Sequence, residues 1–167
     1  LATQSAGLTT SAAAPAALRV RYRIRFSKTG LLRWTSHRDL ARLWERLVRR
    51  AALKLSMSEG FHPKPRIGFP SALALGVEGL GEVVELELAE ELSPADLLSR
   101  LQADDQPGLS IQSVHRLPDG FGKAQLSRSN YQISIVDSED IDKVDRAIGE
   151  FKNRPTVSVT RKGKTLT

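Results

Sequence analysis

The segment from residue 36 to residue 55 carries the clearest helical pattern of the chain together with its densest positive charge. Its apolar residues recur every three or four positions, which in an α-helix places them on one buried stripe. They are Leu40, Leu43, Trp44, Leu47, Val48, Ala51 and Leu55. The pattern predicts a helix that runs to Leu55 and packs against a second layer. Ser36 is its expected N-cap, and Asp39 completes a variant of the capping box.

The arginines of this segment fall off the apolar stripe, at Arg38, Arg42, Arg46, Arg49 and Arg50. Like charges on one helix face repel each other, so folding alone does not favour this arrangement. Residues 1–70 hold 14 of the 25 Lys and Arg but 3 of the 19 Asp and Glu. This asymmetry predicts nucleic acid or an acidic protein surface as the partner. A membrane is not expected, because the apolar side of the helix is needed for the core.

The segment after the helix, residues 56–65, contains two prolines and is expected to be a loop. Phe61, His62, Lys64 and Arg66 would offer stacking, hydrogen-bonding and phosphate-binding groups side by side. The alternative is that Phe61 and Phe69 only fill the core. The residues by themselves leave both interpretations open.

Residues 19–26 alternate arginine with an apolar residue, which predicts a β-strand. Its apolar face would carry Val20, Tyr22, Ile24 and Phe26, and its other face Arg19, Arg21, Arg23 and Arg25. An antiparallel sheet with one solvated face produces this alternation. We expect these arginines to share one nucleic-acid platform with those of the helix. The alternative is a surface strand that is charged against aggregation.

Further strands are expected within residues 67–77, at 82–89 and at 109–117, with a turn at 79–81. Ser93 and Pro94 predict the start of a helix that ends at Gln102. The resulting order, β-α-β-β-α-β, predicts an α+β fold with the ferredoxin-like split βαβ arrangement over residues 19–117. Its antiparallel sheet would carry helices on one face.

The two ends of the chain have a different character. Residues 1–18 are rich in Ala, Ser and Thr and are expected to form a disordered linker. Residues 131–136, 141–151 and 156–160 predict a strand, a helix and a strand. Residues 118–167 are therefore expected to be part of a second ferredoxin-like unit, truncated in this chain.

The three histidines of the chain are candidates for acid–base or metal chemistry. His37, at the start of the helix, could act as a general base, with His62 as its acid, or could bind a phosphate or a backbone carbonyl. His115 fits a structural position in a strand. A metal site built from His37, His62 and Asp39 matches no standard ligand spacing. The chain has no cysteine, which excludes disulfides and thiolate metal sites. We therefore expect no cofactor and no metal in this chain.

Several segments, taken in order, resemble the radical-SAM-linked domain of unknown function. They are residues 25–30, 36–40, the arginine-rich helix, 58–65 and 69–76, and the resemblance spans about residues 19–165. It implies a radical SAM protein or domain that lies upstream or is encoded nearby, and a chain that continues beyond residues 161–164. It supplies no catalytic residue.

The sequence thus predicts a cytoplasmic accessory module that binds tRNA or rRNA, works with a radical SAM enzyme and has no catalysis of its own. The residues expected at the RNA are Arg21, Arg23, Arg25, Lys28, Arg33, His37, Arg38, Arg42, Arg46, Phe61, His62, Lys64 and Arg66, with Trp34 as a second stacking candidate. One alternative is a metal-independent endoribonuclease that uses His37. The other is a protein-docking module for the radical SAM partner. The oligomeric state is not predicted.

Overall fold

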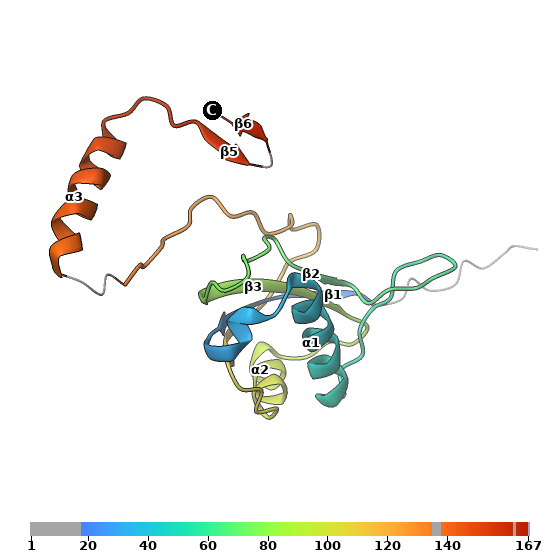
Figure 1. Ribbon diagram of the computed structural model, residues 1–167. Helices are drawn as coiled ribbons and strands as arrows, with labels where there is room; N and C mark the ends of the chain where they lie inside the picture. Colours follow the sequence, from blue (N-terminus) through green and yellow to red (C-terminus); the bar gives the residue numbers. More distant parts are fainter. Residues whose placement is uncertain (1–17, 135–137, 162, 167) are drawn as a thin grey trace, which may run out of the picture. The chain divides into compact units, whose positions relative to one another are not determined.

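The computed structural model describes residues 18–134, 138–161 and 163–166 (Figure 1). The chain divides into a first unit that ends at Ser127 and a second that begins at Arg128. The linker expected over residues 1–18 lies outside the described residues, except for Leu18. Each unit is considered by itself.

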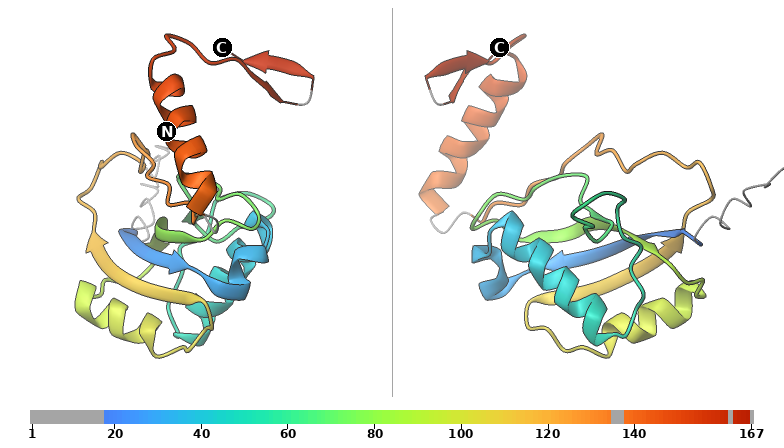
Figure 2. Two further views of the ribbon diagram at one scale, coloured as in Figure 1. Left: turned by 60° about the vertical axis from the view of Figure 1, so that its left-hand side comes forward. Right: turned by 90° about the vertical axis from the view of Figure 1, so that its right-hand side faces the viewer.

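The first unit is a four-stranded antiparallel sheet with two helices. In chain order its elements are β1 (Val20–Lys28), the short 3₁₀ helix η1 (Gly30–Trp34), α1 (His37–Arg50), β2 (Ile67–Gly68), β3 (Gly79–Leu88), α2 (Pro94–Gln102) and β4 (Leu109–Arg116). The strands are ordered β2-β3-β1-β4, and both helices cover the same face of the sheet (Figure 2). This confirms the α+β fold, and the strand order is that of a split βαβ unit.

The core of this unit lies between the inner face of the sheet and the apolar stripe of α1. Tyr22, Ile24 and Phe26 of β1 are fully buried. The ring of Phe26 meets the ring of Trp44 edge-on, with centroids 5.1 Å apart. The stripe predicted from the sequence is confirmed, since its members within α1 are all buried.

The two ends of α1 are set by different interactions. At its start, the Ser36 hydroxyl accepts a hydrogen bond from the Asp39 backbone N–H at 3.2 Å, as the capping pattern predicted. At its end, the expected extension to Leu55 is wrong, because Ala52 adopts a left-handed backbone with φ of 52°. The Leu53 N–H then bonds to the Val48 carbonyl at 3.1 Å, which closes a Schellman-type cap.

Strand β3 differs from its predicted extent as well. Residues 79–81 were expected to form a turn, but they begin β3, and Gly79 pairs with Lys28 of β1. Leu55, expected in the helix, instead forms an isolated β-bridge with Leu88. After α1 ends, the chain therefore turns at Ala52 and runs beside the end of β3.

The second unit contains α3 (Ser138–Lys152) and a hairpin of β5 (Val159–Arg161) and β6 (Lys164–Leu166). The predicted helix at 141–151 and part of the predicted strand at 156–160 are present. Residues 131–134, expected to begin a strand, form none, and positions 135 and 136 lie outside the described residues. Within the described ranges, no helix is long and apolar enough to cross a membrane.

The left-handed residue at the end of α1 gives a stability prediction. An L-residue in the left-handed conformation is strained by about 1–2 kcal/mol, and glycine avoids this strain. Glycine also increases the conformational entropy of the unfolded chain, which offsets part of the gain in stability. We expect Ala52→Gly to raise the free energy of unfolding by about 0.5–1 kcal/mol, measured by urea denaturation.

The matched control is Ala51→Gly, at the neighbouring cap residue with φ of −72°. It should lower the free energy of unfolding, because glycine gains nothing there and loses a side chain that packs against the core. Equal effects of the two substitutions would contradict the role given to Ala52.

Candidate nucleic-acid interface

The outer face of α1 carries a row of exposed arginines, which we call the arginine row: Arg38, Arg42, Arg46 and Arg49. Steps of four, four and three residues place them on one helix face, with neighbouring Cβ atoms roughly 5–6 Å apart. The row is about 16 Å long along the helix axis. It lies opposite the buried stripe, so the packing of α1 turns it toward solvent.

The arginine row is weakly neutralised. Arg42 lies 3.6 Å from Asp39, and both side chains are more than half exposed, so solvent screens this pair. In the part of the chain that the structure describes, Arg38, Arg46 and Arg49 form no ion pair. Arg50 turns away and pairs with Asp104 of the α2–β4 connection. Glu45 lies on the same face, three residues after Arg42 and four before Arg49, but forms no ion pair with a described residue. The row therefore keeps a net positive charge that is exposed to solvent.

The arginines of β1 lie on the other side of the sheet. Tyr22, Ile24 and Phe26 point toward the helices, so Arg21 and Arg23 must point toward the opposite face. The expectation of a single platform shared by β1 and α1 is therefore wrong. The alternation that buries the apolar half of β1 is what separates its arginines from those of α1.

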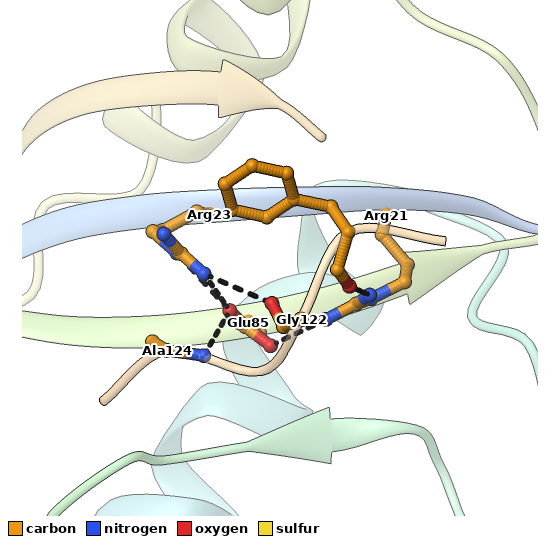
Figure 3. A network of polar contacts seen from close by, with 6 residues as sticks. Arg21, Arg23, Glu85, Gly122 and Ala124 are labelled. Carbon is orange, nitrogen blue, oxygen red and sulfur yellow. Dashed lines mark hydrogen bonds and ion pairs between the residues drawn. The ribbon is translucent and has the colours of Figure 1, made fainter. Parts of the chain in front are cut away.

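Arg21 and Arg23 converge on Glu85 of β3 (Figure 3). The Glu85 carboxylate accepts a hydrogen bond from Arg21 Nη2 at 2.9 Å and from Arg23 Nη2 at 2.6 Å. The backbone N–H of Ala124 donates a further bond to it at 3.0 Å. These arginines are therefore engaged within the protein.

The segment with Ala124, residues 118–124, crosses the face of the sheet that the helices leave open, and we call it the strap (Figure 3). Arg21 donates to the Phe121 carbonyl and Arg23 to the Gly122 carbonyl. The Arg23 guanidinium also lies over the Phe121 ring, 5.4 Å from its centroid. Sheet and strap are thus joined through one carboxylate and two arginines.

The titration of Glu85 reflects this network. Partial burial alone would raise its pKa, but the hydrogen bonds from Arg23, Arg21 and the Ala124 N–H outweigh burial. The net result is a pKa below the ordinary value of 4.5. Folding therefore favours the carboxylate form.

Lys28 is buried and does not reach the surface. It is 1% exposed, and its Nζ donates to the Thr35 carbonyl at 3.0 Å. Burial lowers the pKa of Lys28, against the opposing charge of Glu82, and burial raises the pKa of Glu82, against the charge of Lys28. Lys28 therefore fixes the residue that precedes the N-cap of α1.

The remaining basic candidates are dispersed. Arg33 lies 3.6 Å from Glu78, and its guanidinium is 5.2 Å from the centroid of the exposed Trp34 ring. Arg66 lies 3.5 Å from Glu87. Arg25 is exposed on the strap side of the sheet, away from the arginine row. These residues do not extend the row.

The histidines are not joined into a catalytic pair by any contact that the structure records among the described residues. His37 is exposed and meets the Phe69 ring edge-on at 5.2 Å. His62 lies in the loop after α1, and His115 lies exposed on β4, opposite Arg23. Across the described ranges, no group of three or more His, Asp or Glu could hold a metal ion.

The two phenylalanines that the sequence left ambiguous have different environments. Phe69 packs against the core, whereas Phe61 is fully exposed in the loop, next to the exposed His62 and Lys64. Phe61 therefore has no role in the core.

Sequence reasoning missed Glu85 and the strap. A signal for Glu85 was present, because Glu85 and Glu87 alternate with apolar residues as the arginines of β1 do. Pairing two such strands with their apolar faces on one side brings acids opposite arginines, as the pairs Arg23–Glu85 and Arg21–Glu87 show. The strap has no comparable pattern.

Comparison with known proteins identifies a family. The family model described as "Uncharacterized protein conserved in bacteria (DUF2344)" matches residues 21–166 of the chain. No match was found among curated proteins or among solved structures.

The network on the open face gives a prediction for Glu85→Gln. Loss of the carboxylate leaves Arg21 and Arg23 without their ion pair, so we expect stability to fall by about 1–3 kcal/mol. The Ala124 amide should lose protection from hydrogen exchange. Glu91→Gln is the matched control, because the Glu91 pair with Arg116 is exposed and should contribute little.

The same network predicts an acid transition of the strap. Because the folded pKa of Glu85 is lowered, its stabilisation is complete above its ordinary value of 4.5 and is lost as pH falls through the lowered folded value. Protection of the Ala124 amide should fall over that range in the parent protein. If protection of the Ala124 amide falls as steeply with decreasing pH in the Glu85→Gln variant as in the parent, the Glu85 carboxylate is not the cause of the transition.

Proposed function

The chain belongs to the bacterial family DUF2344, whose description names no activity, and we propose its function from its own surface. It is an RNA-binding accessory module that works with a radical SAM enzyme and performs no catalysis itself. The RNA is structured, as tRNA and rRNA are. The observation that carries the proposal is the arginine row on α1.

The chemistry of the row suits a phosphate backbone. Guanidinium groups bind phosphate oxygens through paired, charge-assisted hydrogen bonds. A nucleic-acid duplex carries roughly one charge per 1.7 Å of its axis, so a cationic surface about 16 Å long can face several phosphates at once. Such contacts position the RNA without reading its sequence.

An acidic protein is a weaker fit to the same face. Stable protein interfaces have an apolar centre with a polar rim, and the exposed face of α1 has no large apolar side chain for such a centre. The apolar residues of α1 are in the core and are not available to a partner. The surface therefore favours RNA over protein docking.

The radical SAM part of the proposal has a separate basis, which is the resemblance of the five sequence segments described above. The arginine row does not bear on it. An endoribonuclease is not proposed, because no recorded contact among the described residues joins His37 to His62.

Binding to a structured RNA should depend strongly on salt and on the arginine row. With three or four phosphate contacts, affinity should fall roughly 40- to 150-fold between about 50 and about 200 mM salt. We expect Arg38→Glu together with Arg46→Glu to weaken binding about tenfold or more and to reduce the salt slope by about 2, measured by fluorescence anisotropy with a labelled RNA hairpin.

The control is Arg25→Glu, which reverses one exposed arginine on the strap side of the sheet, away from the arginine row. It should change the affinity by less than about threefold, and less than the single reversal Arg46→Glu, because it lies outside the proposed contact surface. Equal losses from Arg25→Glu and from Arg46→Glu would show a non-specific charge effect. An affinity that salt leaves unchanged would contradict RNA binding by this surface.

A further inference from the structure

The loop that follows α1, residues 56–66, is braced along its length, and we call it the tip loop. The Ser58 N–H bonds to the Lys64 carbonyl at 2.8 Å, and the Lys64 N–H bonds to the Ser58 hydroxyl at 2.9 Å. Met57 and Pro65 form a β-bridge. The Arg66 N–H bonds to the Ser56 carbonyl at 3.0 Å. Residues 56–58 and 64–66 are therefore bonded to each other and form the stem of the loop, and residues 59–63 form its tip.

The stem is also tied to the sheet. The Ser56 N–H bonds to the Glu87 carbonyl at 2.8 Å, and the Glu87 N–H bonds to the Arg66 carbonyl at 3.1 Å. From this base the tip loop projects beyond the sheet (Figure 1). Gly60, with φ of +117°, makes the turn, and Pro63 and Pro65 restrict the return.

The tip presents one aromatic ring to solvent. Phe61 is 102% exposed, so its side chain gains no burial in this structure. Burial of a phenylalanine ring is favourable, so a fully exposed ring at the end of a braced loop is well suited to a ligand. Trp34 is less available, since it is 58% exposed and the Arg33 guanidinium lies against its ring.

Cationic and polar residues lie near Phe61 in the same loop. Lys64 is exposed and forms no ion pair with a described residue. Glu59 accepts a hydrogen bond from Arg19, with Nη2 of Arg19 2.6 Å from Oε1 of Glu59. This hydrogen bond and the charges of Arg19 and Arg66 lower the pKa of Glu59. His62, the next residue in the chain, is exposed. The tip loop therefore carries an unpaired cation three residues after Phe61, and the acid two residues before Phe61 is paired with Arg19.

We infer that the tip loop binds an unpaired nucleotide of the RNA, with the base stacked on Phe61 and a phosphate at Lys64. This inference rests on the proposed function of the arginine row, which would hold the structured part of the same RNA. An aromatic ring accepts any base by stacking, and an adjacent lysine binds the backbone.

Other ligands fit the tip less well. Membrane insertion requires a broad apolar face, and the neighbours of Phe61 at the tip are Gly60 and His62. A protein hot spot is surrounded by contacts that exclude water, whereas the residues on either side of Phe61, Gly60 and His62, are themselves exposed and offer no apolar rim. Stacking on a single base needs only the ring and a nearby cation.

The test compares two RNA hairpins with the same stem, one blunt and one with three unpaired 3′ nucleotides that include 2-aminopurine. The parent protein should bind the extended hairpin about tenfold more tightly and quench the 2-aminopurine fluorescence. Phe61→Ala should abolish both effects and leave the affinity for the blunt hairpin unchanged. Phe61→Trp should retain both.

The variants separate this inference from the proposed function. If Arg38→Glu with Arg46→Glu leaves binding of both hairpins intact, the proposed function of the row fails. If that variant no longer binds either hairpin, but Phe61→Ala still binds the extended hairpin about tenfold more tightly than the blunt one, the inference about the tip loop fails while the proposed function stands. If neither hairpin binds the parent protein, both fail.

Two further measurements complete the test. Thermal unfolding of Phe61→Ala should match that of the parent, because the ring makes no packing contact that its loss would disturb. Sedimentation with vesicles that contain anionic phospholipid tests the lipid alternative. Vesicle binding that is lost in Phe61→Ala, with the RNA preference retained, would overturn the inference in favour of a membrane.

Discussion

The packing of α1 on the inner face of β1 governs the rest of the first unit. Trp44 meets Phe26 at the centre of this contact, and both are fully buried. The apolar face of β1 and the apolar stripe of α1 can both be buried in only one orientation of each element, because side chains alternate along a strand and a helix has one apolar stripe. As a result, the arginines of β1 and the arginines of α1 lie on opposite sides of the unit.

The two sets of arginines then differ in their neighbours. On the strap side, Glu85 is held between Arg21 and Arg23, and the hydrogen bonds extend to the strap. On the α1 side, the acids near the arginine row are Asp39, which pairs with Arg42, and Glu45, which forms no ion pair with a described residue, and the arginines are exposed. The first set stabilises the fold, whereas the second has no structural role that would explain its charge. This contrast is the reason for the proposal that RNA binds at α1.

Local features of the first unit were predictable, and features that depend on distant residues were not. The cap at Ser36 and the start of α2 at Pro94 each involve residues within one turn of helix. The end of α1 was misjudged because the helical pattern continues to Leu55. There the left-handed Ala52 lets Leu53 reach the protein interior and Leu55 pair with Leu88. Sheet contacts outweigh the local pattern at this point.

The sequence by itself determined the fold class, the buried stripe of α1 and the presence of an excess of arginine, because periodicity and composition are properties of neighbouring residues. Only the tertiary structure decided which arginines are free. Arg21 and Arg23 meet a carboxylate more than sixty residues away, through the register of β1 and β3. It also decided that Phe61 points to solvent while Phe69 packs inward. Charge partners and burial depend on contacts between distant segments, and one-dimensional patterns do not specify those contacts.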